Sequence, residues 1–196
     1  SDPGQKEYTR IIQDSGEHLL SLVNEILDLS KVESGKMEFT WIDVSPADIA
    51  TEITNLHRAP AEAKGLTLSL QLADDLPPTM VTDATRLRQV LNNLLSNAVK
   101  FTEQGGIAVS VSLSGDDLRF AVRDSGPGIP AEARSLVFEK FKQLEHFVTR
   151  SHEGTGLGLA LVKQLSEHMG GRVALESEVG VGSTFIVELP VKASNV

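Results

Sequence analysis

The chain has 196 residues, of which 40% are hydrophobic, and it carries a formal net charge of −9 at pH 7. This length suits one compact domain with an extension. The acidic balance argues against nucleic acid as the main partner, because binding to phosphate backbones requires a basic patch.

Cysteine is absent from the sequence, which excludes disulfides, thiolate zinc sites and a catalytic thiol. No apolar run approaches the ~18 residues that a membrane span needs, and the N-terminus lacks the basic and then apolar pattern of a signal peptide. We therefore expect no membrane contact by this chain and a cytoplasmic location, and we leave open a membrane anchor elsewhere in a longer parent protein.

Residues 5–33 show the heptad pattern of one long helix, which Gly35 ends. The first seam contains Ile12, Leu19 and Ile26, and the second contains Ser15, Leu22 and Leu29. Such a stripe either packs within the molecule or joins two copies of it. Because it lies outside the predicted globular domain, we favour a homodimer formed through this helix.

Downstream of the long helix, strand and helix patterns alternate. The predicted strands are 37–44, 66–72, 107–113, 118–123, 172–177 and 184–189, and the predicted helices are 46–64, 86–102 and one that begins near residue 157. Ser45 caps the first of these helices, with Pro46 in its first turn. The predicted fold class is α/β (α+β), a two-layer sandwich of a mixed sheet covered by helices on one face, preceded by one long dimerisation helix.

The helix predicted at 86–102, the asparagine helix, has polar residues on one stripe. Asp83 can cap it, and Asn93, Asn97 and Lys100 are neighbours at positions i, i+4 and i+7. Two carboxamides and one ammonium on one face can bind a hydrated Mg²⁺ ion and the anionic chain that the ion bridges. The alternative is a solvated polar face.

Two segments contain glycine at alternate positions. The first glycine turn, residues 124–129, begins at Asp124 and contains Gly126 and Gly128, and the second glycine turn, residues 154–159, leads into a helix. Such backbones approach a ligand closely and point N–H groups at phosphate oxygens. Neither is a Walker loop, because no Gly-Lys-Ser/Thr follows. The alternatives are a tight strand-to-helix turn and a glycine-rich helix start.

The asparagine helix, the first glycine turn, Phe138-Glu139-Lys140-Phe141 and the second glycine turn follow one another in this order. Together they resemble the ATP-binding domain of sensor histidine kinases, in a superfamily that also contains gyrase and chaperone ATPases. Two segments, Asn-Ala-Val-Lys-Phe-Thr and Gly-Thr-Gly-Leu-Gly-Leu-Ala, resemble the kinases more than the other members of this superfamily. The resemblance covers essentially the whole chain.

The resemblance implies roles for the helix and the first turn. Asp124 matches the aspartate that accepts a hydrogen bond from the exocyclic amine of adenine, and Gly126 and Gly128 match the glycines of the adenine side. Asn97 matches the principal Mg²⁺ ligand. Asn93 matches the asparagine near the metal and the phosphates, and Lys100 matches a phosphate contact.

The remaining motifs match the phosphate side and its lid. The matching residues of the second glycine turn are Gly154, Thr155, Gly156, Leu157 and Gly158, and Phe138 and Phe141 match the aromatic pair that anchors the lid. Electrostatics adds Arg150, whose guanidinium can contact the terminal phosphate. Some family members carry an arginine shortly after the second phenylalanine, where this chain has Lys142, so the cation that contacts the γ-phosphate stays open.

The resemblance implies that ATP, with Mg²⁺, donates its γ-phosphate to a histidine and that a response regulator or receiver domain then accepts it. The implied domains are 1–35, a partial dimerisation and phosphotransfer hairpin; 36–44, a linker and first strand; 45–192, the ATP-binding catalytic domain; and 193–196, a tail. No histidine in the chain is followed by an acidic residue, Arg or Lys, and Pro. We therefore expect that this fragment does not autophosphorylate.

Two other functions stay open at this point. One is an interaction module gated by ATP or ADP, without kinase activity. The other is an ATPase of the gyrase or chaperone type, which is disfavoured because Asn93 stands where those enzymes have a glutamate base.

Overall fold

The computed structural model describes residues 3–142 and 155–192. The chain divides into two compact units, Ser1–Met37 and Glu38–Val196. Among the described residues, no helix is both long enough and apolar enough to cross a membrane.

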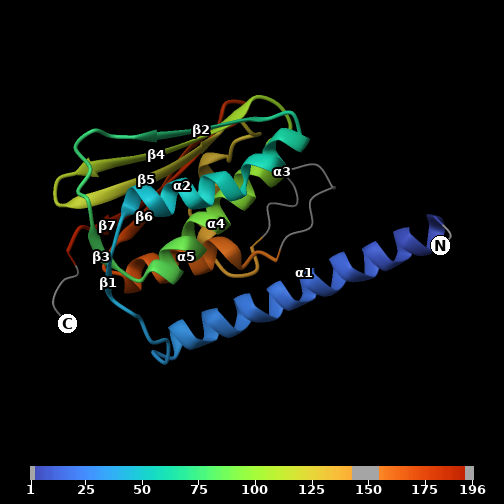
Figure 1. The fold of residues 1–196 in the computed structure, drawn as a ribbon, viewed down its shortest axis with the longest axis horizontal. Helices are drawn as coiled ribbons and strands as arrows, with labels where there is room; N and C mark the ends of the chain where they lie inside the picture. The colour runs from blue at the N-terminus through green and yellow to red at the C-terminus, as the bar shows by residue number, and fades with distance from the viewer. Residues whose placement is uncertain (1–2, 143–154, 193–196) are drawn as a thin grey trace. The chain divides into compact units, whose positions relative to one another are not determined.

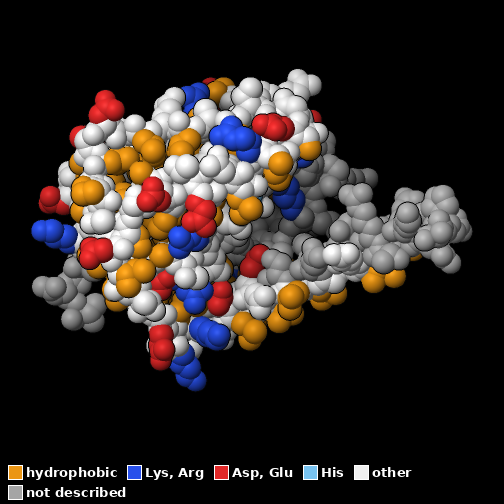
Figure 2. Space-filling model, viewed as in Figure 1, with side chains coloured by type: hydrophobic (Ala, Val, Ile, Leu, Met, Phe, Trp, Pro, Cys, Tyr) orange, Lys and Arg blue, Asp and Glu red, His pale blue; other side chains and the backbone are white. Residues whose placement is uncertain are grey.

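The smaller unit contains one helix, α1 (Pro3–Glu33). Gly35 ends it as predicted, with a φ of 65° and with its N–H donating to the Val32 carbonyl at 3.1 Å. On α1, the side chains of Ile12, Leu19 and Ile26 are 72%, 62% and 48% exposed. Figure 2 shows apolar side chains following one another along this helix. The first predicted seam is therefore accessible to solvent.

The larger unit is built on a five-stranded mixed sheet with the order β2-β4-β5-β7-β6. β2 (Thr67–Leu72) runs parallel to β4 (Gly106–Ser114). The antiparallel pairs are β4 with β5 (Asp117–Asp124), β5 with β7 (Gly182–Pro190) and β7 with β6 (Arg172–Glu178). A separate ladder joins β1 (Ile42–Val44) to β3 (Met80–Thr82). The predicted mixed sheet is confirmed.

Helices cover one face of this sheet, as Figure 1 shows. They are α2 (Pro46–Leu56), α4 (Ala84–Phe101) and α5 (Gly158–His168), and the short α3 (Arg58–Ala63) follows α2. β5 shows why the layers pack: Leu118, Phe120 and Val122 are fully buried, while Arg119 and Arg123 alternate with them toward the other face. The predicted two-layer sandwich is confirmed.

The predicted helix 46–64 is broken at His57 into α2 and α3. Pro60 gives the physical reason. In one continuous helix it would have no N–H to donate to the Leu56 carbonyl, and its ring would clash with that carbonyl.

The predicted strand 37–44 is shortened to Ile42–Val44. Side chains fix the segment before it: the Thr40 N–H donates to Asp83 Oδ2 at 2.9 Å, and the Phe39 ring stacks with the rings of Trp41 and His168, with centroids 6.0 and 6.1 Å apart. β3, the antiparallel partner of β1, was not predicted, because three residues are too few to show an alternation.

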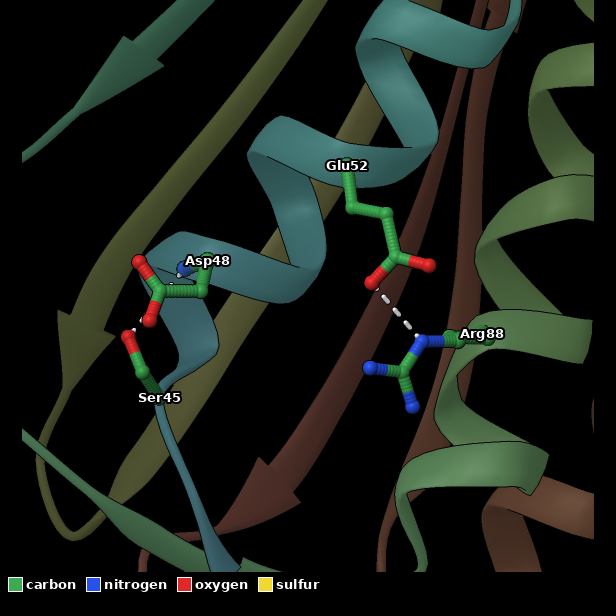
Figure 3. Close-up of polar contacts among 4 residues, drawn as sticks. All are labelled: Ser45, Asp48, Glu52 and Arg88. Carbon is green, nitrogen blue, oxygen red and sulfur yellow. Dashed lines mark hydrogen bonds and ion pairs between the residues drawn. The ribbon is translucent and has the colours of Figure 1, made fainter.

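Both predicted helix caps are confirmed. Ser45 Oγ accepts a hydrogen bond from the Asp48 N–H at 3.1 Å at the start of α2 (Figure 3). At the start of α4, Asp83 Oδ1 accepts from the Arg86 N–H at 3.0 Å, so the two oxygens of Asp83 bind α4 and Thr40 separately. Figure 3 also shows Arg88 of α4 paired with Glu52 of α2, Nε to Oε2 at 2.9 Å.

Candidate nucleotide-binding site

The helix α4 orients the polar stripe. Its buried residues are Ala84, Leu87, Val90, Leu91, Leu94, Leu95, Ala98 and Val99. Their burial leaves Asn93, Asn97 and Lys100 half-buried at the helix surface. The Lys100 ammonium lies 5.2 Å from the centroid of the Phe101 ring. At the C-terminal end of α4, Lys64 Nζ donates to the carbonyls of Val99 and Lys100 at 2.7 and 2.9 Å. These bonds fix the end of the helix nearest the first glycine turn.

The carboxylate of Asp124 lies at the end of β5 and is 8% exposed. Its Oδ1 accepts from the N–H groups of Gly126 at 2.8 Å and Ser183 at 3.3 Å. Within the described part of the chain, the hydrogen bonds of this carboxylate are both made by Oδ1 and none by Oδ2. Burial raises the pKa of Asp124, and the two N–H bonds lower it by less. A buried, partly satisfied carboxylate is suited to accept from one further donor.

The first glycine turn packs closely on its surroundings. A Cβ on Gly126 would lie 2.8 Å from Asp124 Oδ1 and 3.3 Å from the carbonyl oxygen of Phe101, the last residue of α4. Gly128 has a φ of 73°, and a Cβ there would overlap the carbonyl of Glu178. A Cβ at either position would therefore force its neighbours to shift, and the turn lies directly beside the C-terminal end of α4.

The second glycine turn leads into α5. The Leu157 N–H donates to Thr155 Oγ1 at 3.0 Å, and Leu157 itself is buried. Gly158 begins α5, and a Cβ on it would lie 3.6 Å from Asn93 Oδ1. The N-terminus of α5 therefore lies beside the asparagine stripe, in an arrangement that can bind an anion.

The two turns contact α4 at opposite ends of the stripe. The second turn lies against Asn93, and the first lies against Phe101 and Thr102. Thr102 lies nine positions after Asn93, which corresponds to about 14 Å along a helix. The structure therefore places the second turn, the asparagine stripe and the first turn along one helix, with Asn97 between the two turns.

The two phenylalanines of the predicted aromatic pair lie in different environments. Phe138, in the 3₁₀ helix η2 (Leu136–Phe138), packs edge-on against Phe185 of β7, with the centroids 6.3 Å apart. Phe141 is 69% exposed, with a φ of 59°, and its N–H donates to the Gly156 carbonyl at 3.0 Å. This bond joins the two edges of the interval that contains Arg150 and Gly154, which both lie outside the described residues.

The sequence reasoning missed two serines. Ser183 pairs with Asp124 across β5 and β7, and Ser177 pairs with Ser183 across β7 and β6. A signal was present, because both alternate with core residues of their strands, and a serine in the core register suggests a polar contact.

Two family models match the chain. The model for the histidine kinase-, DNA gyrase B-, and HSP90-like ATPase matches residues 82–193, and that for the His Kinase A (phospho-acceptor) domain matches residues 1–35. The first match contains the asparagine stripe, both glycine turns and the two serines.

Relatives match almost the whole chain. Circadian input-output histidine kinase CikA of Synechococcus elongatus is 47% identical over 188 residues, which are 95% of this chain and 25% of CikA. Signal transduction histidine-protein kinase BarA of Escherichia coli is 37% identical over 93% of this chain and 20% of BarA. The chain thus spans between 10% and 27% of the length of these and similar curated relatives.

Solved structures share the fold. Full-length ShkA, crystallised in complex with AMPPNP, superposes with a TM-score of 0.85 at 36% identity, over 98% of this chain and 40% of ShkA. The catalytic domain of histidine kinase ThkA gives a TM-score of 0.68 at 28% identity, over 80% of this chain and 98% of that domain.

Proposed function

The chain belongs to the histidine kinase-, DNA gyrase B-, and HSP90-like ATPase family and carries a histidine kinase ATP-binding catalytic domain, and from this premise we propose that it transfers the γ-phosphate of ATP to a histidine, for relay to a response-regulator aspartate. The histidine kinase relatives and the AMPPNP complex of ShkA support this proposal. The acceptor histidine lies outside this fragment in the proposal.

One arrangement supports the proposed site: the buried Asp124 carboxylate lies near the C-terminal end of α4, and the N-terminus of α5 lies beside Asn93 at the other end of the stripe. The Asp124 carboxylate only accepts hydrogen bonds, so it selects the exocyclic amine of adenine over the six-position carbonyl of guanine. Asn93 and the start of α5 bind the phosphate chain, with Thr155, Gly156 and Leu157 at their N-terminal side. Lys100 contributes positive charge beside the same stripe.

The donor set fits Mg²⁺ that is shared with phosphate oxygens. Among the described residues, no three acidic, histidine or cysteine side chains gather into a metal site. Mg²⁺ in proteins often has few protein ligands and completes its shell with substrate phosphates and waters. The Asn97 amide oxygen would be the protein ligand, and Asn93 would orient the phosphates. When bound, Mg²⁺ supplies charge neutralisation at the phosphates.

Asn93 distinguishes this proposal from ATP hydrolysis. A neutral carboxamide accepts no proton at neutral pH, so at this position it activates no water as a general base. Transfer to a positioned imidazole needs no such base, because placing the two reactants together supplies much of the rate.

The two compact units and the two family matches support a proposed division into domains. Residues 1–35 are assigned as part of the dimerisation and phosphotransfer hairpin, 36–44 as linker and first strand, 45–192 as the catalytic domain and 193–196 as a tail. The exposed seam of α1 supports a homodimer. A structure of ThkA in complex with response regulator TrrA shares the fold, and a receiver domain is the partner that the proposed reaction requires.

Isothermal titration of the 196-residue chain with ATP, with and without Mg²⁺, tests the site. Asn97→Ala removes a ligand and no buried core atom, so it should abolish the Mg²⁺-dependent part of ATP binding and leave the unfolding midpoint near that of the wild type. Ser96→Ala, which changes an exposed neighbour off the stripe, is the matched control and should bind as the wild type does. Equal Mg²⁺-ATP affinity in Asn97→Ala and wild type would remove Asn97 from the site.

A further inference from the structure

Three polar residues form a row across one end of the sheet. In the ladders, Asp124 of β5 pairs with Ser183 of β7, which pairs with Ser177 of β6. All three occupy the register of the core residues, on the face that the helices cover. Ser177 is two strands away from Asp124 and has no direct contact with it.

The hydroxyl of Ser177 joins this row to the first glycine turn. Its Oγ accepts from the Ile129 N–H at 2.8 Å, donates to the Gly182 carbonyl at 3.0 Å, and lies 2.9 Å from Ser183 Oγ. One assignment uses every site on the oxygen: Ile129 and Ser183 donate to it, and its own proton goes to Gly182. A fully used hydroxyl has one orientation, so it positions its partners.

The backbones of the first glycine turn and of the β6–β7 hairpin are also hydrogen-bonded and in close contact. The Gly180 N–H, in the β6–β7 loop, donates to the Pro127 carbonyl at 2.8 Å. Gly128 lies against the Glu178 carbonyl, and Gly182 lies so close to the Asp124 carbonyl that a Cβ would overlap it. The end of the β6–β7 hairpin is thus one wall of the first glycine turn, and Ser177, like Asp124, has a side chain that bonds to the backbone of both.

We propose that Ser177 is a positioning residue for base recognition: it fixes Ile129 on one side and the Gly182 to Ser183 backbone on the other, so that the Ser183 N–H stays on Asp124 Oδ1 and Oδ2 faces the base. This inference rests on the proposed function of Asp124. Ser177 itself does not touch the nucleotide. Its removal therefore weakens recognition of the base and leaves recognition of the phosphates unchanged, because the anion-binding end lies at the far end of the α4 stripe.

The test compares side chains of equal shape. Ser177→Thr retains the hydroxyl, Ser177→Val has the same branched shape without it, and both residue types are favourable in strands; Ser177→Ala is the simple deletion. Ser110→Ala, a half-buried serine on the other face of β4, is the matched control. The affinities for ATP, GTP and inorganic tripolyphosphate are measured on the whole chain in Mg²⁺ by titration, together with the unfolding midpoint.

The Val and Ala variants should lose roughly fivefold to tenfold in ATP affinity, the effect of one hydrogen bond, and their preference for ATP over GTP should fall by the same factor. Their affinity for tripolyphosphate should stay that of the wild type. Ser177→Thr and Ser110→Ala should match the wild type for all ligands.

Equal ATP to GTP ratios in the Thr and Val variants would overturn the role of Ser177, and so would a parallel loss of tripolyphosphate affinity, which indicates a general loosening of the site. Both outcomes leave wild-type ATP selectivity intact and so leave the proposed function standing. A wild-type chain that binds ATP no better than GTP would instead contradict the assignment of Asp124, and the role of Ser177 with it.

Discussion

Asp124→Asn should lower the affinity for ATP and, at neutral pH, raise the stability of the nucleotide-free protein. Asn retains an oxygen that can accept from Gly126 and Ser183, as Oδ1 does at 2.8 and 3.3 Å, so the turn is preserved. Its amide nitrogen then takes the place of Oδ2 and presents a donor to the donor of adenine. Hydrogen bonds to charged groups contribute about 1.5–3 kcal/mol. The expected loss in ATP affinity is therefore roughly tenfold to a hundredfold.

The stability of the nucleotide-free protein should change in the opposite direction. Burial raises the pKa of Asp124 in the folded state, so the folded protein binds this proton more tightly than the unfolded chain does. The stabilisation from that proton is present at low pH and is lost as pH rises through the folded pKa. At neutral pH the buried charge costs stability, and Asp124→Asn, which has no charge, should unfold at higher urea than the wild type.

Titration calorimetry with ATP and urea unfolding at several pH values measure both effects. The stability advantage of Asp124→Asn should shrink as pH falls through the raised pKa of Asp124. Asp117→Asn, at the other end of β5 and 3.4 Å from the Arg172 guanidinium, is the control and should leave ATP affinity unchanged. Unchanged ATP affinity in Asp124→Asn would contradict the role of Asp124 in base recognition, and a lower urea midpoint at neutral pH would contradict the destabilising effect of its buried charge.

Three further outcomes are expected. Lys64→Met, which retains the aliphatic stem but removes both bonds to the end of α4, should lower the free energy of unfolding by about 1–3 kcal/mol, measured in urea; no change would show that water replaces the ammonium. Leu19→Glu on the exposed seam of α1 should weaken self-association in sedimentation velocity, whereas Asn24→Glu, off the seam, should not; equal behaviour of the two would argue against the seam. The chain incubated with γ-labelled ATP should gain no acid-labile phosphate, and stoichiometric label on any of its five histidines would identify an acceptor within it.

Local patterns predicted most of this fold because the determining residues are close together in the sequence. The apolar spacing of α4, its Asp83 cap and the alternation along β5 each depend on neighbours. The break at His57 was predictable too, since Pro60 alone forbids a continuous helix. β3 was not, because its three residues show no period, and only its pairing with β1 identifies it as a strand.

The same distinction, between features set by nearby residues and features set by distant pairing, applies to the candidate site. Asn93, Asn97 and Lys100 share a stripe by helical spacing alone, and Asp124 and its glycines form one turn. What the sequence does not contain is register: Ser183 reaches Asp124 only because β5 and β7 pair with these two residues opposite each other, 59 positions apart. Contacts of that kind depend on the whole sheet and on no local pattern.

Asp83 has a thermodynamic consequence. Its carboxylate accepts one bond from the first turn of α4 and another from Thr40, in the segment that leads to β1. The two attachments share one side chain, so the free energy of ordering the α4 N-terminus and that of attaching Thr40 are linked. Linkage is reciprocal. If ordering this turn of α4 strengthens the attachment of Thr40 by some factor, then attaching Thr40 favours the ordered turn by that same factor, and releasing Thr40 weakens the cap to an equal extent.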